Sequence, residues 1–392
     1  MSQRIYLTDP TCEQFAGKVV SRREEDGSWW LELDRTCFYV EGGGQPSDAG
    51  TIGAANVLRV FEHEGHVWHV VDRPVPENDV IGRVNMAVRH DYSVQHTGQH
   101  ILSQAYWRLF AAATSSFHLT DKSVSIDLSL GDMTEAQIAA GEALANEIIR
   151  RGLPIGTSFH DDRETLPEEL RKSPVVKGPI RLVSVGDFDM CPCGGTHVAT
   201  TAEVQFIKVL ATERTRGRTR VIFVCGERAL REYARRIASD NVLAQMLSAP
   251  YAEQPEAIER LLTTEKELRR ERTRLSRELM EYRAVSASPH STFTWGTYFE
   301  FPEWNEEMDD AKYLLAAISR MRRPAVAVLV MPQDPARIFI SSSSALEAGA
   351  MLRQLYAKYD GKGGGNAHAA QGSLPAAQVQ DALETLRETL SQ

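Results

Sequence analysis

Two short motifs, nearly a hundred residues apart, constrain this chain most strongly. Residues 96–100 read HTGQH and residues 191–197 read CPCGGTH. Together they supply three imidazoles and a thiol, from His96, His100, Cys193 and His197. This donor set suits Zn²⁺, because Mg²⁺ and Ca²⁺ prefer oxygen ligands. A metal bound by segments so far apart in sequence requires a compact domain that folds around it.

The histidine pair lies in a predicted helix. Apolar residues around HTGQH recur at roughly helical spacing, from Val94 to Phe110. Residues four apart share one face of a helix, so His96 and His100 can converge on one ion.

The second motif predicts a different local structure. The two glycines between Cys193 and His197 predict a tight turn that runs into a strand over residues 198–210. Such a turn lets the thiolate and the imidazole face the same way. Cys191 is an alternative sulfur ligand, although Cys193 has the better spacing to His197.

Composition is that of an ordinary globular protein, and 392 residues allow two or three domains. No apolar run approaches membrane-spanning length and no signal-peptide pattern opens the chain, so we expect a cytoplasmic protein without a membrane partner. Five cysteines, two of them in the second motif, argue against a disulfide framework. The net charge of −9 argues against broad nonspecific nucleic-acid binding but allows a local basic face.

The pattern of elements predicts an α+β multidomain protein with four parts. Short alternating segments in residues 1–85 predict a small β-barrel. Residues 86–226 mix helices and strands around both motifs. Residues 227–290 are predicted to be helical, and their interrupted apolar seam favours a short packed hairpin over a long coiled coil. Residues 291–392 predict a small α/β domain with a second glycine-rich loop at 361–372.

Two further segments are candidates for ligand contacts. The stretch EGGGQPSDAGTIG is too rich in glycine for an ordinary strand, so it is either a flexible turn or a loop whose backbone approaches a ligand at Gly42, Gly43 and Gly44. The stretch TERTRGRTR predicts a hairpin turn, either simply solvated or contacting phosphates through Arg214, Arg216, Arg218 and Arg220.

The three motifs HTGQH, CGGTHV and EGGGQPSDAGTI resemble the editing domain of alanyl-tRNA synthetase and its free-standing relatives, the alanyl-tRNA editing proteins. The final domain, with its KGGG segment, is similar to the DHHA1 domain of the long form. No aminoacylation domain precedes residue 1, so the resemblance implies an editing protein and not a synthetase. It also implies Zn²⁺ as cofactor and tRNA(Ala) carrying a wrong amino acid as partner, with the C-terminal domain supplying a second RNA contact or a homodimer surface.

The implied chemistry is plausible on physical grounds. A pocket for alanine cannot strongly reject glycine or serine, since such differences are worth only about 1–3 kcal/mol, so hydrolytic editing is needed. Zinc can lower the pKa of bound water to about 7 or polarise the ester carbonyl. Four protein ligands, however, close a tetrahedral site. Either one ligand is loose, or the coordination expands, or the metal only positions the substrate.

The sequence thus predicts a zinc-dependent deacylase of seryl-tRNA(Ala), with glycyl-tRNA(Ala) as a second candidate substrate. Thr97 and Gln45 are the candidate catalytic groups near the amino acid, or alternatively make only local hydrogen bonds. Two other functions stay open: a non-catalytic tRNA-binding module with a structural zinc, and a hydrolase of another aminoacyl ester or thioester.

Overall fold

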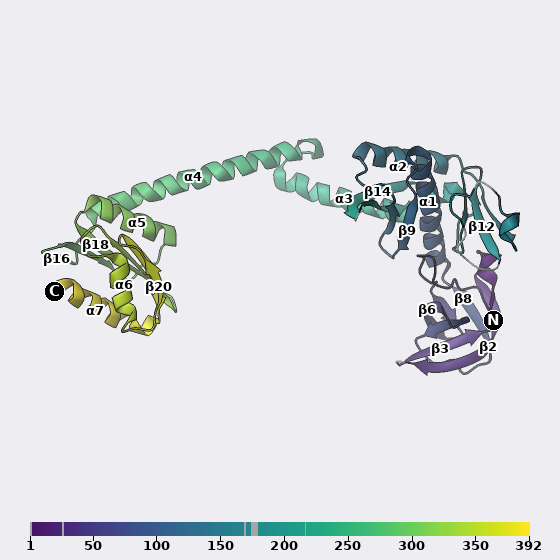
Figure 1. Cartoon of the computed structure of the whole chain (residues 1–392), viewed down its shortest axis with the longest axis horizontal. Helices are drawn as coiled ribbons and strands as arrows, with labels where there is room; N and C mark the ends of the chain where they lie inside the picture. Colours follow the sequence, from purple (N-terminus) through teal and green to yellow (C-terminus); the bar gives the residue numbers. More distant parts are fainter. Residues whose placement is uncertain (1, 26, 168–169, 174–178, 216) are drawn as a thin grey trace. The chain divides into compact units, whose positions relative to one another are not determined.

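The structure is a computed structural model that describes residues 2–25, 27–167, 170–173, 179–215 and 217–392 (Figure 1). It consists of two compact units, Met1–Val242 and Leu243–Gln392, each of which is described here by itself. Helices and sheets occur in both units, so the predicted α+β multidomain class is confirmed. Among the residues described, no helix is both long and apolar enough to cross a membrane.

Six strands near the N-terminus close into a barrel. Its hydrogen-bonded order is β2 (Gln14–Glu25), β3 (Ser28–Leu33), β7 (His66–Val71), β6 (Ala55–His63), β5 (Gly50–Ile52) and β8 (Asp79–Val84). Apolar side chains such as Leu31, Leu33 and Val60 fill its interior. His69 is buried among them, where its Nε2 lies 2.9 Å from Thr36 Oγ1. Beside the barrel, β1 (Gln3–Arg4) pairs with β4 (Arg35–Thr36).

The N-terminal unit contains a disulfide between Cys12 and Cys37. The number of cysteines predicted no disulfide framework, and for this pair that prediction is wrong. Cys37 lies in the barrel core and Cys12 packs against that core, with the two Cα atoms 5.9 Å apart. A count of cysteines cannot show which of them the fold brings together. Cys191, Cys193 and Cys225 are free.

The remainder of the first unit surrounds helix α1 (Met86–Phe110), which begins after Asn85, whose side chain accepts from the N–H groups of Ala87 and Val88. One sheet has the order β14–β15–β10–β9 and another β11–β12–β13. The other elements are β9 (Thr114–Leu119), β10 (Val124–Leu128), α2 (Glu135–Arg150), β11 (Ile155–His160), β12 (Ile180–Val185), β13 (Asp189–Pro192), β14 (Ile207–Thr215) and β15 (Arg218–Cys225).

The segment that follows the CGGTH motif differs from the predicted strand. It forms a 3-10 helix, Thr201–Val204, before β14 begins at Ile207. Thr201 donates its hydroxyl to the carbonyl of Ile148, and Thr200 forms a capping box with Glu203. Such side chain–backbone bonds compete with the hydrogen bonds of a strand.

Two helices follow β15: α3 (Gly226–Leu247) and α4 (Gln254–Ser286). The sequence predicted that their apolar seam packs as a short helical hairpin. That prediction is wrong for α4, a helix of 33 residues whose seam side chains are exposed. The exposed side chains are Leu261, Leu262, Leu268, Leu275, Leu279 and Tyr282.

The C-terminal domain is built on a six-stranded sheet in the order β16–β17–β18–β19–β21–β20, with an apolar core on each face. Its elements are β16 (Ser291–Phe293), β17 (Gly296–Phe301), α5 (Met308–Met321), β18 (Ala325–Met331), β19 (Ala336–Ser342), α6 (Ala348–Tyr356), β20 (Lys362–Gly365), β21 (Ala369–Leu374) and α7 (Val379–Ser391). The predicted glycine-rich loop is instead the edge strand β20 and its turn into β21. A Cβ on Gly363 would lie 2.4 Å from the carbonyl oxygen of Gln371, so only glycine allows this close pairing.

Candidate metal centre

The four residues of the two motifs come together in the first unit. α1 presents His96 and His100, and the loop after β13 presents Cys193 and His197. One potential ligand atom from each residue lies within 4.8 Å of every other, which makes the cluster a group that could bind a metal ion. The Nε2 atoms of His96 and His197 each lie 3.4 Å from Cys193 Sγ. Cys191 is not part of the cluster and lies in β13.

Each imidazole of the cluster is oriented through its other nitrogen. His96 Nδ1 lies 2.7 Å from Gln45 Oε1, and His197 Nδ1 lies 3.1 Å from Thr97 Oγ1. His100 Nδ1 lies 3.3 Å from Asp189 Oδ2. All three Nδ1 atoms are thus occupied by protein partners, which leaves each Nε2 for the centre of the cluster. Metal-binding histidines are fixed in this way.

Gln45 and Thr97, the predicted catalytic groups, are both buried behind these imidazoles. Gln45 also donates to Thr196 Oγ1 and accepts from the Thr196 N–H. Thr97 Oγ1 accepts from the N–H of Val198. The hydrogen bonds of both side chains therefore connect the imidazoles of the cluster to the rest of the protein.

The predicted glycine loop brings Gln45 to the cluster. Gly42 and Gln45 form an isolated bridge, and the carbonyl of Gly44 accepts from the N–H of Leu119. Gly44 has a φ of +86° and lies so close to β9 that a Cβ would be 2.4 Å from the carbonyl oxygen of Phe117. The backbone of this loop approaches the protein itself at Gly44, while Gly43 has open space beside it.

The cluster also has an acidic partner with its own counter-ion, neither of which was predicted from the sequence. Asp189, which accepts from His100, is clamped by Arg171 through two hydrogen bonds of 2.8 and 2.9 Å. Burial favours the neutral acid, but the bonds with His100 and Arg171 outweigh it and lower the pKa of Asp189 to about 2. The position of Asp189, four residues before Cys193, was a usable signal, whereas Arg171 is distant in sequence and was not foreseeable.

The two cysteines of the motif differ electrostatically. Burial raises the pKa of the Cys191 thiol to about 11, so it stays protonated at neutral pH. Burial also opposes ionisation of Cys193, but the imidazoles of His96 and His197 outweigh it and lower the pKa of this thiol well below its ordinary range. Only a thiolate is a good metal ligand.

The glycines of the CGGTH motif have unequal roles. The backbone bends at Gly195, and neither glycine has a positive φ, so the bend does not use the left-handed conformation that favours glycine. Gly195 is required by space instead, because a Cβ there would lie 2.2 Å from His96 Cε1 and 2.9 Å from Gln45 Oε1. Gly194 has no such neighbour within 4 Å.

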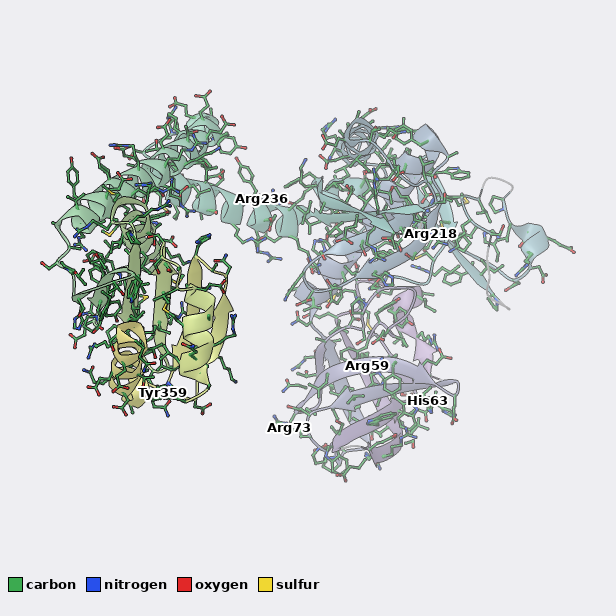
Figure 2. All side chains as sticks on the ribbon, turned by 60° about the vertical axis from the view of Figure 1, so that its left-hand side comes forward. Arg59, His63, Arg73, Arg218, Arg236 and Tyr359 are labelled. Atoms are coloured by element: carbon green, nitrogen blue, oxygen red, sulfur yellow. A yellow bond between two sulfur atoms is a disulfide. The ribbon has the colours of Figure 1, made fainter. Side chains whose placement is uncertain are left out.

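Three of the arginines predicted to contact RNA, Arg214, Arg218 and Arg220, lie on the hairpin formed by β14 and β15, and they differ in whether an acidic side chain already pairs with them. Arg220 forms two hydrogen bonds with Asp127, and the exposed Arg214 pairs with Asp132 at 2.9 Å. Arg218 is exposed and has no ion pair in the described part of the chain (Figure 2). Arg216 lies outside the described residues.

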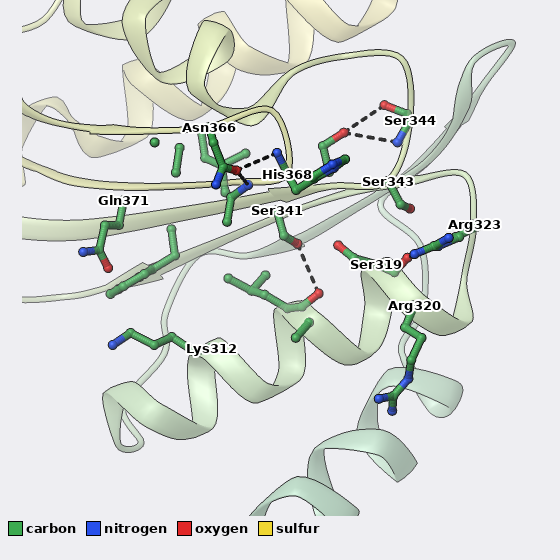
Figure 3. A pocket seen from close by; sticks show the side chains of 18 of the residues that line it. Lys312, Ser319, Arg320, Arg323, Ser341, Ser343, Ser344, Asn366, His368 and Gln371 are labelled. Carbon is green, nitrogen blue, oxygen red and sulfur yellow. Dashed lines mark hydrogen bonds between the residues drawn. The ribbon is translucent and has the colours of Figure 1, made fainter.

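A separate cavity of about 910 Å³ lies in the C-terminal domain between α5, β19 and the turn from β20 to β21 (Figure 3). Cationic and amide side chains line it, together with Ser341, Ser342, Ser343 and Ser344. Asn366 Oδ1 accepts from the N–H groups of His368 and Ala369, which shapes the turn. The lining side chains that bear charge or an amide include Lys312, Arg320, Arg323, Asn366 and Gln371.

Comparisons with known proteins show which family the chain resembles in sequence. Residues 180–222 match the family of the threonyl and alanyl tRNA synthetase second additional domain, and residues 296–392 match the DHHA1 domain. The alanyl-tRNA editing protein AlaX-L of Pyrococcus horikoshii is 31% identical, with both chains covered completely. The alanyl-tRNA editing protein Aarsd1 of Mus musculus is 32% identical over 70% of this chain and 68% of its own length. Alanine–tRNA ligase of Pyrococcus abyssi is 29% identical over 99% of this chain but only 44% of its own length. The chain therefore belongs to the alanyl-tRNA editing protein family, in the form that carries a DHHA1 domain.

Proposed function

We propose that the chain hydrolyses seryl-tRNA(Ala) in a zinc-dependent reaction, with glycyl-tRNA(Ala) as the second candidate substrate. As an alanyl-tRNA editing protein it is a hydrolase of the aminoacyl-tRNA ester bond, and tRNA is its partner. The observation that carries the zinc proposal is the cluster of His96, His100, Cys193 and His197, in which every imidazole Nδ1 is already bonded to the protein.

The donor set fits zinc better than a harder cation. Three imidazole nitrogens and one thiolate are typical Zn²⁺ ligands, and none of the four is an oxygen donor. A bound zinc ion would supply Lewis-acid chemistry, by activating water or by polarising the ester carbonyl.

The protein's own side chains give the cluster its form. Asp189 and Arg171 fix His100, while Gln45 and Thr97 fix His96 and His197. We keep Gln45 and Thr97 as the candidate polar groups near the bound amino acid, because each lies directly against a ligand imidazole.

Selectivity for serine follows from hydrogen bonding. A buried polar group that bonds the serine hydroxyl would be left without a partner when alanine binds, and such a loss is costly. Correctly charged alanyl-tRNA(Ala) would therefore be spared. This discrimination does not depend on whether the metal acts on water or on the carbonyl.

The proposed function involves four parts of the chain. We propose a barrel at residues 1–85, the editing core at 86–226, a helical connection at 227–290 and the DHHA1-like domain at 291–392.

Arg218 would contact the tRNA backbone, because it is charged, exposed and has no ion pair within the described chain. The cavity of the C-terminal domain would supply a second RNA contact, or this domain would form a homodimer surface, and we expect the protein to act in the cytoplasm.

A second function is favoured by one specific observation. Four protein donors would fill a tetrahedral coordination sphere, as in structural zinc sites. The chain would then be a tRNA-binding module whose zinc has no part in turnover. Hydrolysis of another aminoacyl ester or thioester is the remaining alternative.

The deciding experiment is the release of labelled amino acid from seryl-, glycyl- and alanyl-tRNA(Ala). We expect fast release of serine, slow release of alanine, loss of activity with a chelator and its return when zinc is added. Equal rates for serine and alanine would contradict the specificity. No hydrolysis by the zinc-loaded chain, with tRNA binding intact, would establish the binding module instead.

A further inference from the structure

Arg181 is a buried arginine with an unusual set of partners. It lies on β12 and is only 8% exposed. The buried arginines Arg89 and Arg228 pair with the carboxylates of Asp48 and Asp91. Within the described residues, Arg181 has no carboxylate at ion-pair distance and donates only to backbone carbonyls. Burying a charge without a counter-ion is costly, so such a residue needs an explanation.

The hydrogen-bond partners of the Arg181 guanidinium show what the buried charge stabilises. One guanidinium nitrogen, Nη1, donates to the carbonyls of both Cys193 and Gly195 at 2.9 Å. The backbone carbonyl of Arg181 also accepts from the N–H of Cys193 at 3.1 Å. On the other side, Nε donates to the carbonyl of Leu7, at the end of the N-terminal 3-10 helix Ile5–Leu7. One side chain thus connects the ligand loop, β12 and the N-terminal segment.

The loop that Arg181 binds, residues 193–197, packs closely against the other side chains of the cluster. Gly195 donates its N–H to Cys193 Sγ at 3.3 Å, and its Cα lies against the ring of His96. Arg181 fixes the opposite end of the same residue by binding its carbonyl. A shift of this carbonyl would therefore move both the thiolate and the neighbouring imidazole.

We propose that Arg181 is a positioning residue of the metal centre, whose guanidinium fixes the loop carrying Cys193 and His197. Arginine suits this task because two separate nitrogens of its planar fork reach carbonyls on opposite sides. Lysine would keep the charge but has one nitrogen, so it can serve one side well and not both. The inference rests on the metal centre proposed above.

The test compares Arg181→Met and Arg181→Lys with the wild-type full-length chain, using Co²⁺ as a spectroscopic probe of the zinc site. Affinity is measured by competition with a chelator, and ligand geometry by the visible absorption of bound Co²⁺. Losing a partner behind a metal ligand typically costs about 10–100-fold in metal affinity. We expect a loss of that size with an altered spectrum for Arg181→Met, and a smaller loss for Arg181→Lys.

Arg22→Met is the matched control. Arg22 also donates to backbone carbonyls, those of Val75, Pro76 and Glu77, and to Asn78 Oδ1, but it is an exposed side chain of β2 that contacts the loop before β8. This variant should keep the Co²⁺ affinity and spectrum of the wild type. An equal loss in both methionine variants would overturn the proposal, since it would reflect general loosening of the unit.

The remaining outcomes distinguish failure of the proposed metal centre from failure of the proposed role of Arg181. If the wild-type chain binds neither Co²⁺ nor Zn²⁺, the metal centre fails and the role of Arg181 fails with it. If the wild type binds and Arg181→Met keeps its affinity and spectrum, only the role of Arg181 is refuted. If circular dichroism shows that Arg181→Met does not fold, Arg181→Lys decides, and wild-type behaviour of that variant refutes the proposal.

Discussion

Replacing Gly195 with alanine should damage the metal centre through a single added methyl group. The new Cβ would lie 2.2 Å from His96 Cε1 and 2.4 Å from His96 Nδ1, whereas ordinary contacts begin near 3.4 Å. Either the imidazole or the loop must therefore retreat by about 1 Å, and the bond between His96 and Gln45 lies in the path of that movement. A displacement of about 1 Å can cost about 100-fold in catalysis.

Gly194→Ala is the matched comparison, because it adds the same methyl group to the adjacent residue. No atom lies within 4 Å of that Cβ position. We expect Gly195→Ala to bind zinc about 10–100-fold more weakly and to deacylate seryl-tRNA(Ala) about 100-fold more slowly, while Gly194→Ala stays close to the wild type. Zinc competition titrations and single-turnover deacylation measure the two effects. Equal behaviour of the two variants would refute the steric argument, whichever way both moved.

Three further predictions concern the metal centre, the arginine hairpin and the barrel core of the first unit. Cys193→Ala should remove zinc from the purified chain while Cys191→Ala retains it, as elemental analysis would show, and full occupancy in the Cys193 variant would exclude that thiolate as a ligand. Arg218→Ala should lower the slope of log tRNA affinity against log salt by about 0.7–0.9, the effect of one lost phosphate contact. Arg220→Ala should lower that slope less, since Arg220 is paired with Asp127. An unchanged slope for the Arg218 variant would show that the hairpin is not part of the RNA interface. Burial lowers the pKa of His69 to about 4 from an ordinary 6.5. The folded state therefore has its full stability above pH 6.5 and loses stability as the pH falls towards 4, where the unfolded chain binds a proton that the buried imidazole does not. The free energy of unfolding in urea should decline by about 3 kcal/mol over that range; His69→Gln should flatten this decline, and a pH-independent wild type would contradict the prediction.

Sequence periodicity identified the elements that depend on local chemistry. The helix bearing His96 and His100 was predictable, because its apolar spacing is specified within a few turns. The hairpin between β14 and β15 was predictable for the same reason.

Tertiary contacts account for what the sequence did not reveal. The Cys12–Cys37 disulfide and the clamp of Arg171 on Asp189 join residues that no local pattern relates. The need for glycine at position 195 arises from the ring of a histidine about a hundred residues earlier. The glycine-rich segment of the C-terminal domain was predicted as a loop, because the pairing that makes it a strand comes from β21.

The spacing of the metal ligands also has a consequence for synthesis of the chain. His96 and His100 leave the ribosome long before Cys193 and His197, so a nascent chain can offer only half of the donor set at first. Two imidazoles alone form an incomplete site, so the full set of four donors exists only after residue 197 has been synthesised. A metal ion would therefore be bound by all four side chains only late in synthesis or after it. Protein made during zinc starvation should then recover deacylation when the metal is added later, without new synthesis.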